Sequence, residues 1–342
     1  MAKKKSSFTD RILEDFGEKV LDNHTKEVTA ISTGSLSLNS AIGIGGIPKG
    51  MITEIFGMEG SGKTTIALCT AMGVANSGNK VLYIDSENLL NTELLKAVLG
   101  TKLTNPENIV IVTPDSAEDC FMIAEAGIES EEFELIVLDS IGSMMSRKEK
   151  KLEFDKDTMM VVPRLVGKFI KRNTYGIRTS NIAVLLVNQV RDNVGAYVKS
   201  LSSPGGHVLH HQAAVRISLS KGEDLKRGEE KVGILVKFVI KKNKLAPPFR
   251  SFTIPLIFGE GIDYLSDLLD FSKLIGVIQM AGPYYKFEGV NLAQGKVATR
   301  AFLEANPETL DRIVKVVYNT INKTSTLIEL IDDMETTQEE EE

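Results

Sequence analysis

The chain of 342 residues is 42% hydrophobic and 25% charged, which is typical of a globular protein with a full core and predicts one large domain plus a smaller one. No apolar run is long enough to span a membrane, and Met1–Ser7 lacks the apolar segment of a secretory signal. The net charge of −6 argues, taken alone, against a polyanionic partner.

The charge is unevenly distributed. Residues 329–342 carry eight acidic side chains and no lysine or arginine, which leaves residues 1–328 with a net charge of +2. We expect this acidic tail to be solvated and disordered, and as a mobile anion it could compete with nucleic acid for a basic groove. Cys69 and Cys120 lack the spacing of metal ligands, so we interpret them as reduced core thiols of an intracellular, cytoplasmic protein.

The N-terminal region predicts a short amphipathic helix, capped by Ser7 or Thr9. One face of this helix carries four apolar side chains: Phe8, Ile12, Leu13 and Phe16. Such a helix must dock on its own domain or on a neighbouring subunit, and the sequence leaves both open. Residues 28–50 are rich in glycine and small side chains, and we expect them to wrap the edge of a sheet rather than form a long element.

A phosphate-binding loop is predicted between a strand at Ile52–Phe56 and a helix at Lys63–Ala75. The intervening GMEGSGKTT fits the P-loop pattern of two glycines five apart, followed by Lys and then Ser or Thr. A glycine-rich turn points backbone N–H groups at phosphate oxygens, and the positive end of the next helix adds to the attraction. Lys63 would reach the β- and γ-phosphates, and the Thr64 hydroxyl would bind Mg²⁺. The alternative is a chance glycine turn, but strand, loop and helix all fall where the motif requires them.

Further buried strands are predicted downstream, and two of them end in acidic residues. Val81–Asp85 is followed by Glu87, Ile109–Thr113 is a plain apolar run, and Leu135–Asp139 has four apolar residues before its acid. Ligands of open α/β sheets bind at the carboxyl ends of strands. A single strand followed by Asp would most simply be a buried strand. Beside a P-loop, however, Asp139 is well suited to hold the magnesium shell next to Thr64.

The middle of the chain predicts two flexible loops around a helix and a strand. Residues 147–157 are highly charged without a steady period, and residues 190–206 are rich in glycine and serine. Between them we expect a helix at Met159–Arg172 and a buried strand at Ile182–Asn188 that leads into Gln189.

The last part of the core predicts two strands, Ala213–Leu219 and Ile234–Ile240, divided by a charged turn from Gly222 to Gly233. Residues 221–250 hold nine Lys or Arg against four acids, which is either a solvated face or a specific binding surface. Phe258–Ile262 looks like a domain boundary, and the following residues mix helical patterns with short strands.

Taken together, these segments resemble the bacterial RecA recombinase family. The resemblance covers about residues 28–307, in the family's order and spacing, with an acidic tail of the family's kind. The segments that carry it are ISTGSLSLNSAIGIGGIPKG (31–50), GMEGSGKTT (57–65), VLYIDSEN (81–88), LIVLDSIG (135–142), LLVNQVR (185–191), KKNKLAPPF (241–249), FGEGI (258–262) and LAQGK (292–296). A generic P-loop protein would not contain KKNKLAPPF or NQVR.

The resemblance implies an α/β P-loop core with a mostly parallel twisted sheet flanked by helices. It also implies four regions: an oligomerisation segment at 1–27, an ATPase core at 28–262, a small C-terminal α/β domain at 263–328 and the acidic tail at 329–342. The implied activity is ATP-dependent filament formation on single-stranded DNA, followed by pairing and strand exchange with a homologous duplex.

The resemblance also implies roles for individual residues, with ATP and Mg²⁺ as cofactors. Glu87 would position the attacking water, and Gln189 would sense the γ-phosphate and signal to the loop at 190–206. Lys242 and Lys244 would reach the γ-phosphate of the adjacent subunit in a helical homo-oligomer. The residues expected around the nucleotide are Gly57, Glu59, Gly60, Ser61, Gly62, Lys63, Thr64, Thr65, Asn91 and Tyr264, with Thr64 and Asp139 at the metal.

Loops at about 148–159 and 190–206 would line the DNA channel. The implied DNA-binding residues are Met159, which would wedge between bases, Arg164, Arg191, Tyr197, Gly205 and Gly206. Backbone contacts without base readout would make binding tolerant of sequence and sensitive to salt.

The chain also departs from the family. Asn91 and Leu94 stand where the family has Asp and then Tyr near adenine, so Tyr264 is expected to take part of that contact. The second loop is about one residue shorter, so Tyr197 does not align with the family's aromatic residue there. The histidines at 207, 210 and 211 replace Asn, Lys and an interface Phe, and we interpret them as interface or solvent residues rather than metal ligands.

Two other functions stay open at the level of sequence. One is a DNA-coating filament that signals to a repair factor and hydrolyses ATP only to disassemble. The other is a hexameric motor such as a helicase, which the KKNK segment argues against. The unusual N-terminal segment and the histidines mildly favour a phage or plasmid copy over a cell's main recombinase.

Overall fold

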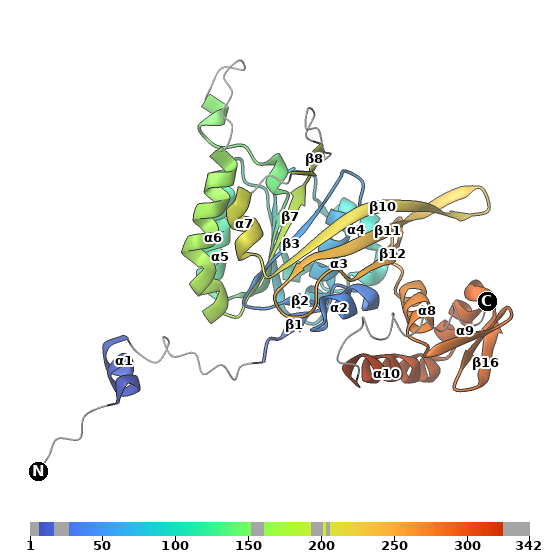
Figure 1. Ribbon diagram of the computed structural model, residues 1–342. Coiled ribbons are helices and arrows are strands. Elements are labelled where there is room, and N and C mark those ends of the chain that lie inside the picture. Colours follow the sequence, from blue (N-terminus) through green and yellow to red (C-terminus); the bar gives the residue numbers. More distant parts are fainter. Residues whose placement is uncertain (1–6, 17–26, 152–160, 193–200, 203–205, 324–342) are drawn as a thin grey trace, which may run out of the picture.

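The computed structural model describes residues 7–16, 27–151, 161–192, 201–202 and 206–323 (Figure 1). It confirms the predicted α/β class, with a large, mostly parallel sheet between layers of helices and a small C-terminal unit beside it. No helix in the described part of the chain is both long enough and apolar enough to cross a bilayer.

Nine strands form the central sheet in the order β13-β12-β11-β10-β3-β7-β6-β4-β5. Neighbours from β10 to β5 run parallel, whereas β10 to β13 pair antiparallel. The strands are β3 (Ile52–Gly57), β4 (Lys80–Asp85), β5 (Ile109–Val112), β6 (Phe133–Asp139), β7 (Ala183–Gln189), β10 (Val215–Arg227), β11 (Glu230–Asn243), β12 (Ser251–Ile257) and β13 (Gly261–Ile262).

Helices cover both faces because alternate residues of the buried strands point to opposite sides. Val81 and Tyr83 of β4 pack in one apolar cluster, while Leu82 and Ile84 pack in the other. The first cluster is completed by α2 (Leu36–Ile42), α3 (Lys63–Asn76) and α4 (Thr92–Leu99). The second is completed by α5 (Ala117–Ser130), α6 (Val161–Thr179) and α7 (Gly206–Gln212). Short 3-10 turns lie at Gly100–Lys102, Pro106–Asn108, Ile141–Ser143 and Glu149–Lys151.

Residues 27–50 follow the expectation of short elements. β1 (Ala30–Ile31) pairs with β2 (Ile47–Pro48), and the fully buried α2 lies between them. The predicted N-terminal helix is also present, as α1 (Phe8–Phe16).

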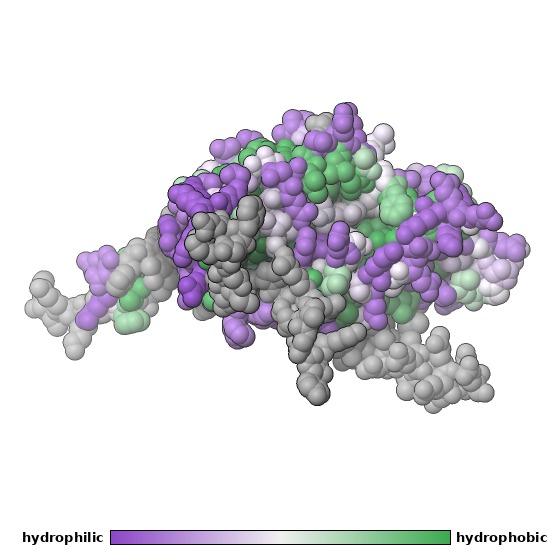
Figure 2. All heavy atoms as spheres, turned by 90° about the horizontal axis from the view of Figure 1, so that it is seen from above, coloured by the Kyte–Doolittle hydropathy of each residue, from purple (hydrophilic) through white to green (hydrophobic). Residues whose placement is uncertain are grey.

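Two sequence expectations about element lengths were wrong. The predicted turn at 222–233 is instead a ribbon, because β10 and β11 continue to Arg227 and Glu230 and turn at Gly228. Charged side chains point to solvent on this projecting part, which hides the strand pattern in the sequence; hydrophilic residues cover it in Figure 2. The predicted helix at 159–172 runs on to Thr179, and its Gly176 faces α5, where a Cβ atom would lie 3.3 Å from the Ile128 side chain.

The C-terminal unit has its own apolar cluster. Three helices pack beside a small antiparallel sheet of order β14-β15-β16. The elements are α8 (Tyr264–Leu274), β14 (Ile278–Ala281), β15 (Tyr284–Phe287), β16 (Val290–Gln294), α9 (Gly295–Ala305) and α10 (Pro307–Lys323).

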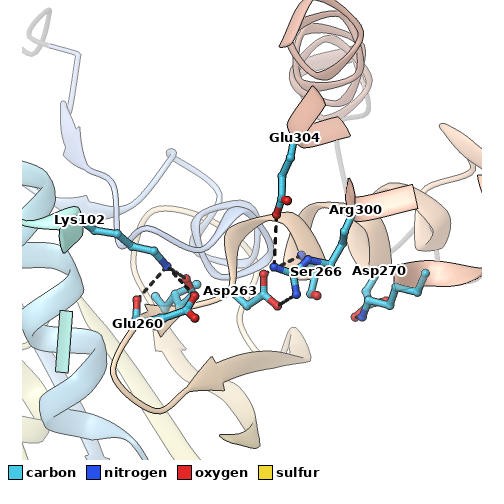
Figure 3. A network of polar contacts seen from close by, with 9 residues as sticks. Lys102, Glu260, Asp263, Ser266, Asp270, Arg300 and Glu304 are labelled. Atoms are coloured by element: carbon cyan, nitrogen blue, oxygen red, sulfur yellow. Dashed lines mark hydrogen bonds and ion pairs between the residues drawn. The ribbon is translucent and has the colours of Figure 1, made fainter. Parts of the chain in front are cut away.

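Polar contacts lie on both sides of the boundary between this unit and the core. On the core side, Lys102 donates to the carbonyls of Glu260 and Ile262; within the unit, Asp263 caps α8 and accepts from Arg300 of α9 (Figure 3). A fully buried contact joins the two: Asp267 of α8 accepts from the hydroxyls of Ser35 and Ser37 and from the Ser37 N–H at the start of α2. Burial is the largest cause that raises the pKa of Asp267.

Candidate nucleotide site and nucleic-acid loops

The P-loop lies between β3 and α3, and its glycines are sterically required. A Cβ atom at Gly57 would lie 2.3 Å from the carbonyl oxygen of Leu219 on β10. Gly62 has φ +83° and would bring a Cβ 2.6 Å from the Leu256 side chain. Glu59 and Gly60 are exposed at the tip of the loop. The loop backbone therefore packs against β10 and β12 more closely than a residue with a side chain would allow.

Polar groups of the loop are available for an anion. The Ser61 hydroxyl is buried and has no hydrogen-bond partner among the described residues. Lys63 Nζ donates to the Met58 carbonyl at 2.8 Å, and burial lowers its pKa. Thr64 and Thr65 occupy the first turn of α3. An unpaired hydroxyl, a lysine and a helix N-terminus fit a nucleotide phosphate with its magnesium ion.

Asp139 lies at the carboxyl end of β6 beside this loop. It is almost completely buried and accepts a hydrogen bond from the Tyr83 hydroxyl at 2.7 Å, while the nearby Thr64 hydroxyl acts to lower its pKa. Burial raises the pKa of Asp139 to about 6. Burial and the negative charge of Asp139 raise the pKa of Tyr83 well above its ordinary value, so the phenol remains a donor.

Glu87 follows β4 and is held by donors from two other strands. The Ser140 hydroxyl donates to Glu87 Oε1 at 2.7 Å, and Gln189 Nε2 donates to the same oxygen at 2.9 Å. The turn that carries Glu87 is organised by Asp85, which accepts the N–H groups of residues 87, 89 and 90 at 2.7–3.0 Å. Four strands thus bring Lys63, Glu87, Asp139 and Gln189 to one end of the sheet.

Two side chains in this arrangement, Tyr83 and Ser140, were not predicted from the sequence. Ser140 directly follows the strand-ending acid, which was a usable signal. The sequence offers no signal for Tyr83, because a tyrosine within a buried strand cannot be told from any other core aromatic residue. The peptide bond between Asp139 and Ser140 is cis.

Lys242 and Lys244 are not brought to the P-loop of their own chain. Lys242 Nζ donates to the carbonyls of His210 and His211 at 2.7 and 2.8 Å, and Lys244 Nζ lies 3.4 Å from the Gln212 carbonyl. The Lys244 N–H donates to the Ala214 carbonyl, and the Ala214 N–H donates to the carbonyl of Ile52, the first residue of β3. The Lys244 backbone therefore lies beside the amino end of β3. Gly57 is five residues along that strand, or roughly 16 Å away. Burial is the largest cause that lowers the pKa of Lys242.

A buried ion pair lies next to these lysines. Arg216 of β10, the register partner of Lys242, contacts the fully buried Glu54 of β3 and stacks over the Phe56 ring at 4.7 Å. Glu54 also accepts from the Asn188 amide at 2.9 Å. Burial and the Arg216 charge lower the pKa of His210, whose ring lies edge-on to that of His207 at 6.5 Å. The role predicted for the histidines stays a prediction.

The residues predicted at the adenine are in different surroundings. Asn91 is exposed and caps α4, where its side chain accepts the Leu94 N–H at 2.8 Å. Tyr264 begins α8 with 38% of its surface exposed, and burial raises its pKa to about 12. The structure assigns neither residue to a nucleotide.

The predicted DNA-binding residues are only partly described. Arg164 is exposed in the first turn of α6, and Gly206 begins α7 with φ +69°. Arg191 lies in β8 (Arg191–Asp192), which pairs with β9 (Leu201–Ser202). Met159, Tyr197, Gly205 and the acidic tail lie outside the described residues. Arg191 and Asp192 of β8 follow Gln189, the last residue of β7, after only one intervening residue.

Comparisons with known proteins cover most of the chain. The family model of the RecA N-terminal domain matches residues 6–263, and that of the RecA C-terminal domain matches residues 266–322. The chain is 36% identical to Protein RecA of Aquifex aeolicus over 288 residues, which cover 84% of this chain and 82% of that protein. It is 31% identical to Protein RecA of Bacteroides thetaiotaomicron over 319 residues, 92% of this chain and 96% of that protein. Both family models and these relatives agree with the fold and the P-loop geometry, so the chain belongs to the RecA family.

Proposed function

We propose that this protein is an ATP-dependent recombinase that forms helical filaments on single-stranded DNA, pairs the strand with a homologous duplex and exchanges strands. The observation that carries the proposal is the contact of Gln189 with Glu87 beside the P-loop. Gln189 ends β7 and directly precedes the predicted DNA loop at 190–206, so this one side chain would link the nucleotide site to that loop.

At the phosphates, the chain's contribution is positioning and charge. The N–H groups of the P-loop and Lys63 would bind the phosphate oxygens, and Thr64 and Asp139 would hold the magnesium shell. Bound Mg²⁺ supplies positive charge that neutralises the phosphates during transfer. Glu87, held by Ser140 and Gln189, would orient the water that attacks the γ-phosphate.

Lys242 and Lys244 would complete the site of a neighbouring subunit. They lie at the other end of β3 from their own P-loop, so a head-to-tail arrangement is needed to bring them to a nucleotide. A cation supplied in trans is worth about 10³–10⁵ in rate in related phosphoryl transfers. Hydrolysis would therefore depend on assembly.

DNA would lie along the loops near residues 148–159 and 190–206. Arg164 and Arg191 would contact phosphates, so that binding is salt-dependent and homology is tested by base pairing between strands. The acidic tail would compete with DNA for this basic surface.

The test combines ATP hydrolysis with a joint-molecule assay. We expect hydrolysis to rise on addition of single-stranded DNA, and D-loops to form with ATP and a homologous duplex. Lys63→Ala should abolish ATP binding. Glu87→Gln should bind ATP and DNA but hydrolyse about 10²–10⁴-fold more slowly. Glu107→Gln, at the amino end of β5 and away from the site, is the matched control.

Specific outcomes would overturn the proposal. Absence of D-loops with all components present would rule out strand exchange. Full biological output from Glu87→Gln would favour a filament that only coats DNA and signals. Closed rings in electron microscopy, without helical filaments, would favour a motor of the helicase type.

A further inference from the structure

Tyr83 occupies an unusual place for a core aromatic residue. It is fully buried in β4, and its ring belongs to the apolar cluster beneath α3. In the parallel register Tyr83 pairs with Val137, two residues before Asp139, so both side chains point to the α3 face of the sheet. The hydroxyl consequently meets the carboxylate, and it donates to Asp139 Oδ2 at 2.7 Å.

The hydroxyl is not explained by packing. A phenylalanine would fill the same apolar space, whereas a buried hydroxyl needs a partner to offset its lost hydration. The acceptor is the carboxylate of Asp139, which is 4% exposed and lies near the Thr64 hydroxyl. A donor on a fully buried ring cannot swing away, so it fixes the rotation of the carboxylate about its Cβ–Cγ bond.

We propose that Tyr83 is a positioning residue for magnesium: it holds Asp139 Oδ2 so that the rest of the carboxylate is presented to Thr64 and the P-loop. This inference rests on the proposed function, in which Asp139 and Thr64 hold the metal of MgATP. Partners that orient a metal-binding carboxylate typically change metal affinity by about 10–100-fold when they are removed.

The test is a magnesium titration of nucleotide binding, which does not depend on hydrolysis. Full-length wild-type protein and Tyr83→Phe are mixed with a fluorescent ATP analogue, and the magnesium concentration that gives half of the binding increase is measured. We expect this midpoint to rise about 10-fold or more in Tyr83→Phe. Binding in EDTA should stay unchanged, because the P-loop contacts are intact. Saturating magnesium should restore binding.

Two further variants separate positioning from packing. Tyr285→Phe removes the hydroxyl of a buried tyrosine in the C-terminal unit and should leave the midpoint unchanged. In an Asp139→Asn background, Tyr83→Phe should cause no additional shift, because the carboxylate it orients is gone.

The outcomes are distinguishable. A midpoint within about twofold of wild type in Tyr83→Phe overturns the inference and leaves the proposed function intact. Lost binding that saturating magnesium does not restore shows that the hydroxyl serves folding, and also overturns it. If magnesium has no effect on ATP binding by the wild type, the proposed function itself fails.

Discussion

Gln189 Nε2 lies 2.9 Å from Glu87 Oε1, and the same oxygen accepts the Ser140 hydroxyl at 2.7 Å. Gln189 is the last residue of β7 and Glu87 lies in the turn after β4, and β6 lies between these two strands in the sheet. Any movement of the Gln189 backbone therefore acts on the carboxylate that we propose to orient water. If DNA binds the loop that follows Gln189, as we propose, this contact would carry its effect to the geometry at the phosphate.

The first prediction concerns this coupling. Gln189→Ala removes the amide that donates to Glu87 but leaves the carboxylate and Ser140 in place. We expect basal ATP hydrolysis to change little and stimulation by single-stranded DNA to fall by about 5–150-fold, the range of a 1–3 kcal/mol coupling. Steady-state hydrolysis with and without DNA measures both quantities.

The control for this variant is Gln279→Ala, an exposed glutamine on β14 in the C-terminal unit. It should retain full stimulation. If Gln189→Ala were stimulated as strongly as wild type while binding DNA normally, the contact with Glu87 would not transmit the signal.

Some residues of this candidate site could be predicted from the sequence, and others could not. The P-loop, Glu87, Asp139 and Gln189 could be singled out because each lies at or just after the end of a buried strand, and strand ends can be located from apolar runs; the roles of Glu87 and Gln189 were implied by the family resemblance. Two of the donors that hold these carboxylates, Tyr83 and Ser140, were missed, because strand register brings each to a partner on a neighbouring strand.

The fold, too, has features that the sequence predicts and features that it does not. Sheet class and helix positions follow from hydrophobic periodicity, which is a local property. The β10–β11 ribbon was mistaken for a turn because its projecting strands have no buried face to produce alternation. The contact of Asp267 with Ser35 and Ser37 joins residues about 230 positions apart, which no local pattern encodes.

The second prediction tests whether the site is shared between subunits. Lys242→Ala should assemble on DNA but hydrolyse ATP poorly, and Lys63→Ala should fail to bind ATP. In an equal mixture, about a quarter of head-to-tail interfaces pair an intact P-loop with an intact lysine. We expect the mixture to regain activity that neither variant has alone.

Hydrolysis measured across mixing ratios, with a maximum near equal amounts, would support shared sites. Activity of the mixture equal to the sum of its two components would show that Lys242 does not act on a neighbour's nucleotide. Lys80→Ala mixed with Lys63→Ala serves as the control. Lys80 lies at the amino end of β4, so its substitution alters neither the P-loop nor Lys242.

The third prediction concerns the salt dependence of DNA binding. Arg164 is exposed in the first turn of α6, beside the predicted loop. If it contacts one phosphate, Arg164→Ala should weaken binding to all sequences alike and reduce the slope of log K against log salt by about 0.7. Fluorescence anisotropy with a labelled oligonucleotide at several salt concentrations measures the slope. Lys80→Ala should leave it unchanged, and an unaltered slope in Arg164→Ala would exclude the contact.

The fourth prediction concerns how the C-terminal unit is fastened to the core. Asp267→Ala leaves the Ser35 and Ser37 hydroxyls and the Ser37 N–H buried without their acceptor. We expect the free energy of unfolding to fall by about 1–3 kcal/mol for the unsatisfied groups. Asp270→Ala, on the exposed side of α8 where Asp270 pairs with Lys296, should cost less than about 1 kcal/mol. Urea unfolding compares the two, and equal losses would contradict a special role for Asp267.

The same residue predicts a pH dependence with a definite sign. The folded-state pKa of Asp267 is raised, chiefly by burial, so the folded state binds its proton more tightly than the unfolded chain. The resulting stabilisation is complete below the ordinary carboxyl pKa of about 4 and is lost as the pH rises through the raised value. Asp267→Asn cannot titrate. The unfolding free energy of wild type minus that of Asp267→Asn should therefore fall as the pH rises above about 4. A difference that rises with pH instead would mean that the hydrogen bonds from Ser35 and Ser37 outweigh burial and lower the pKa.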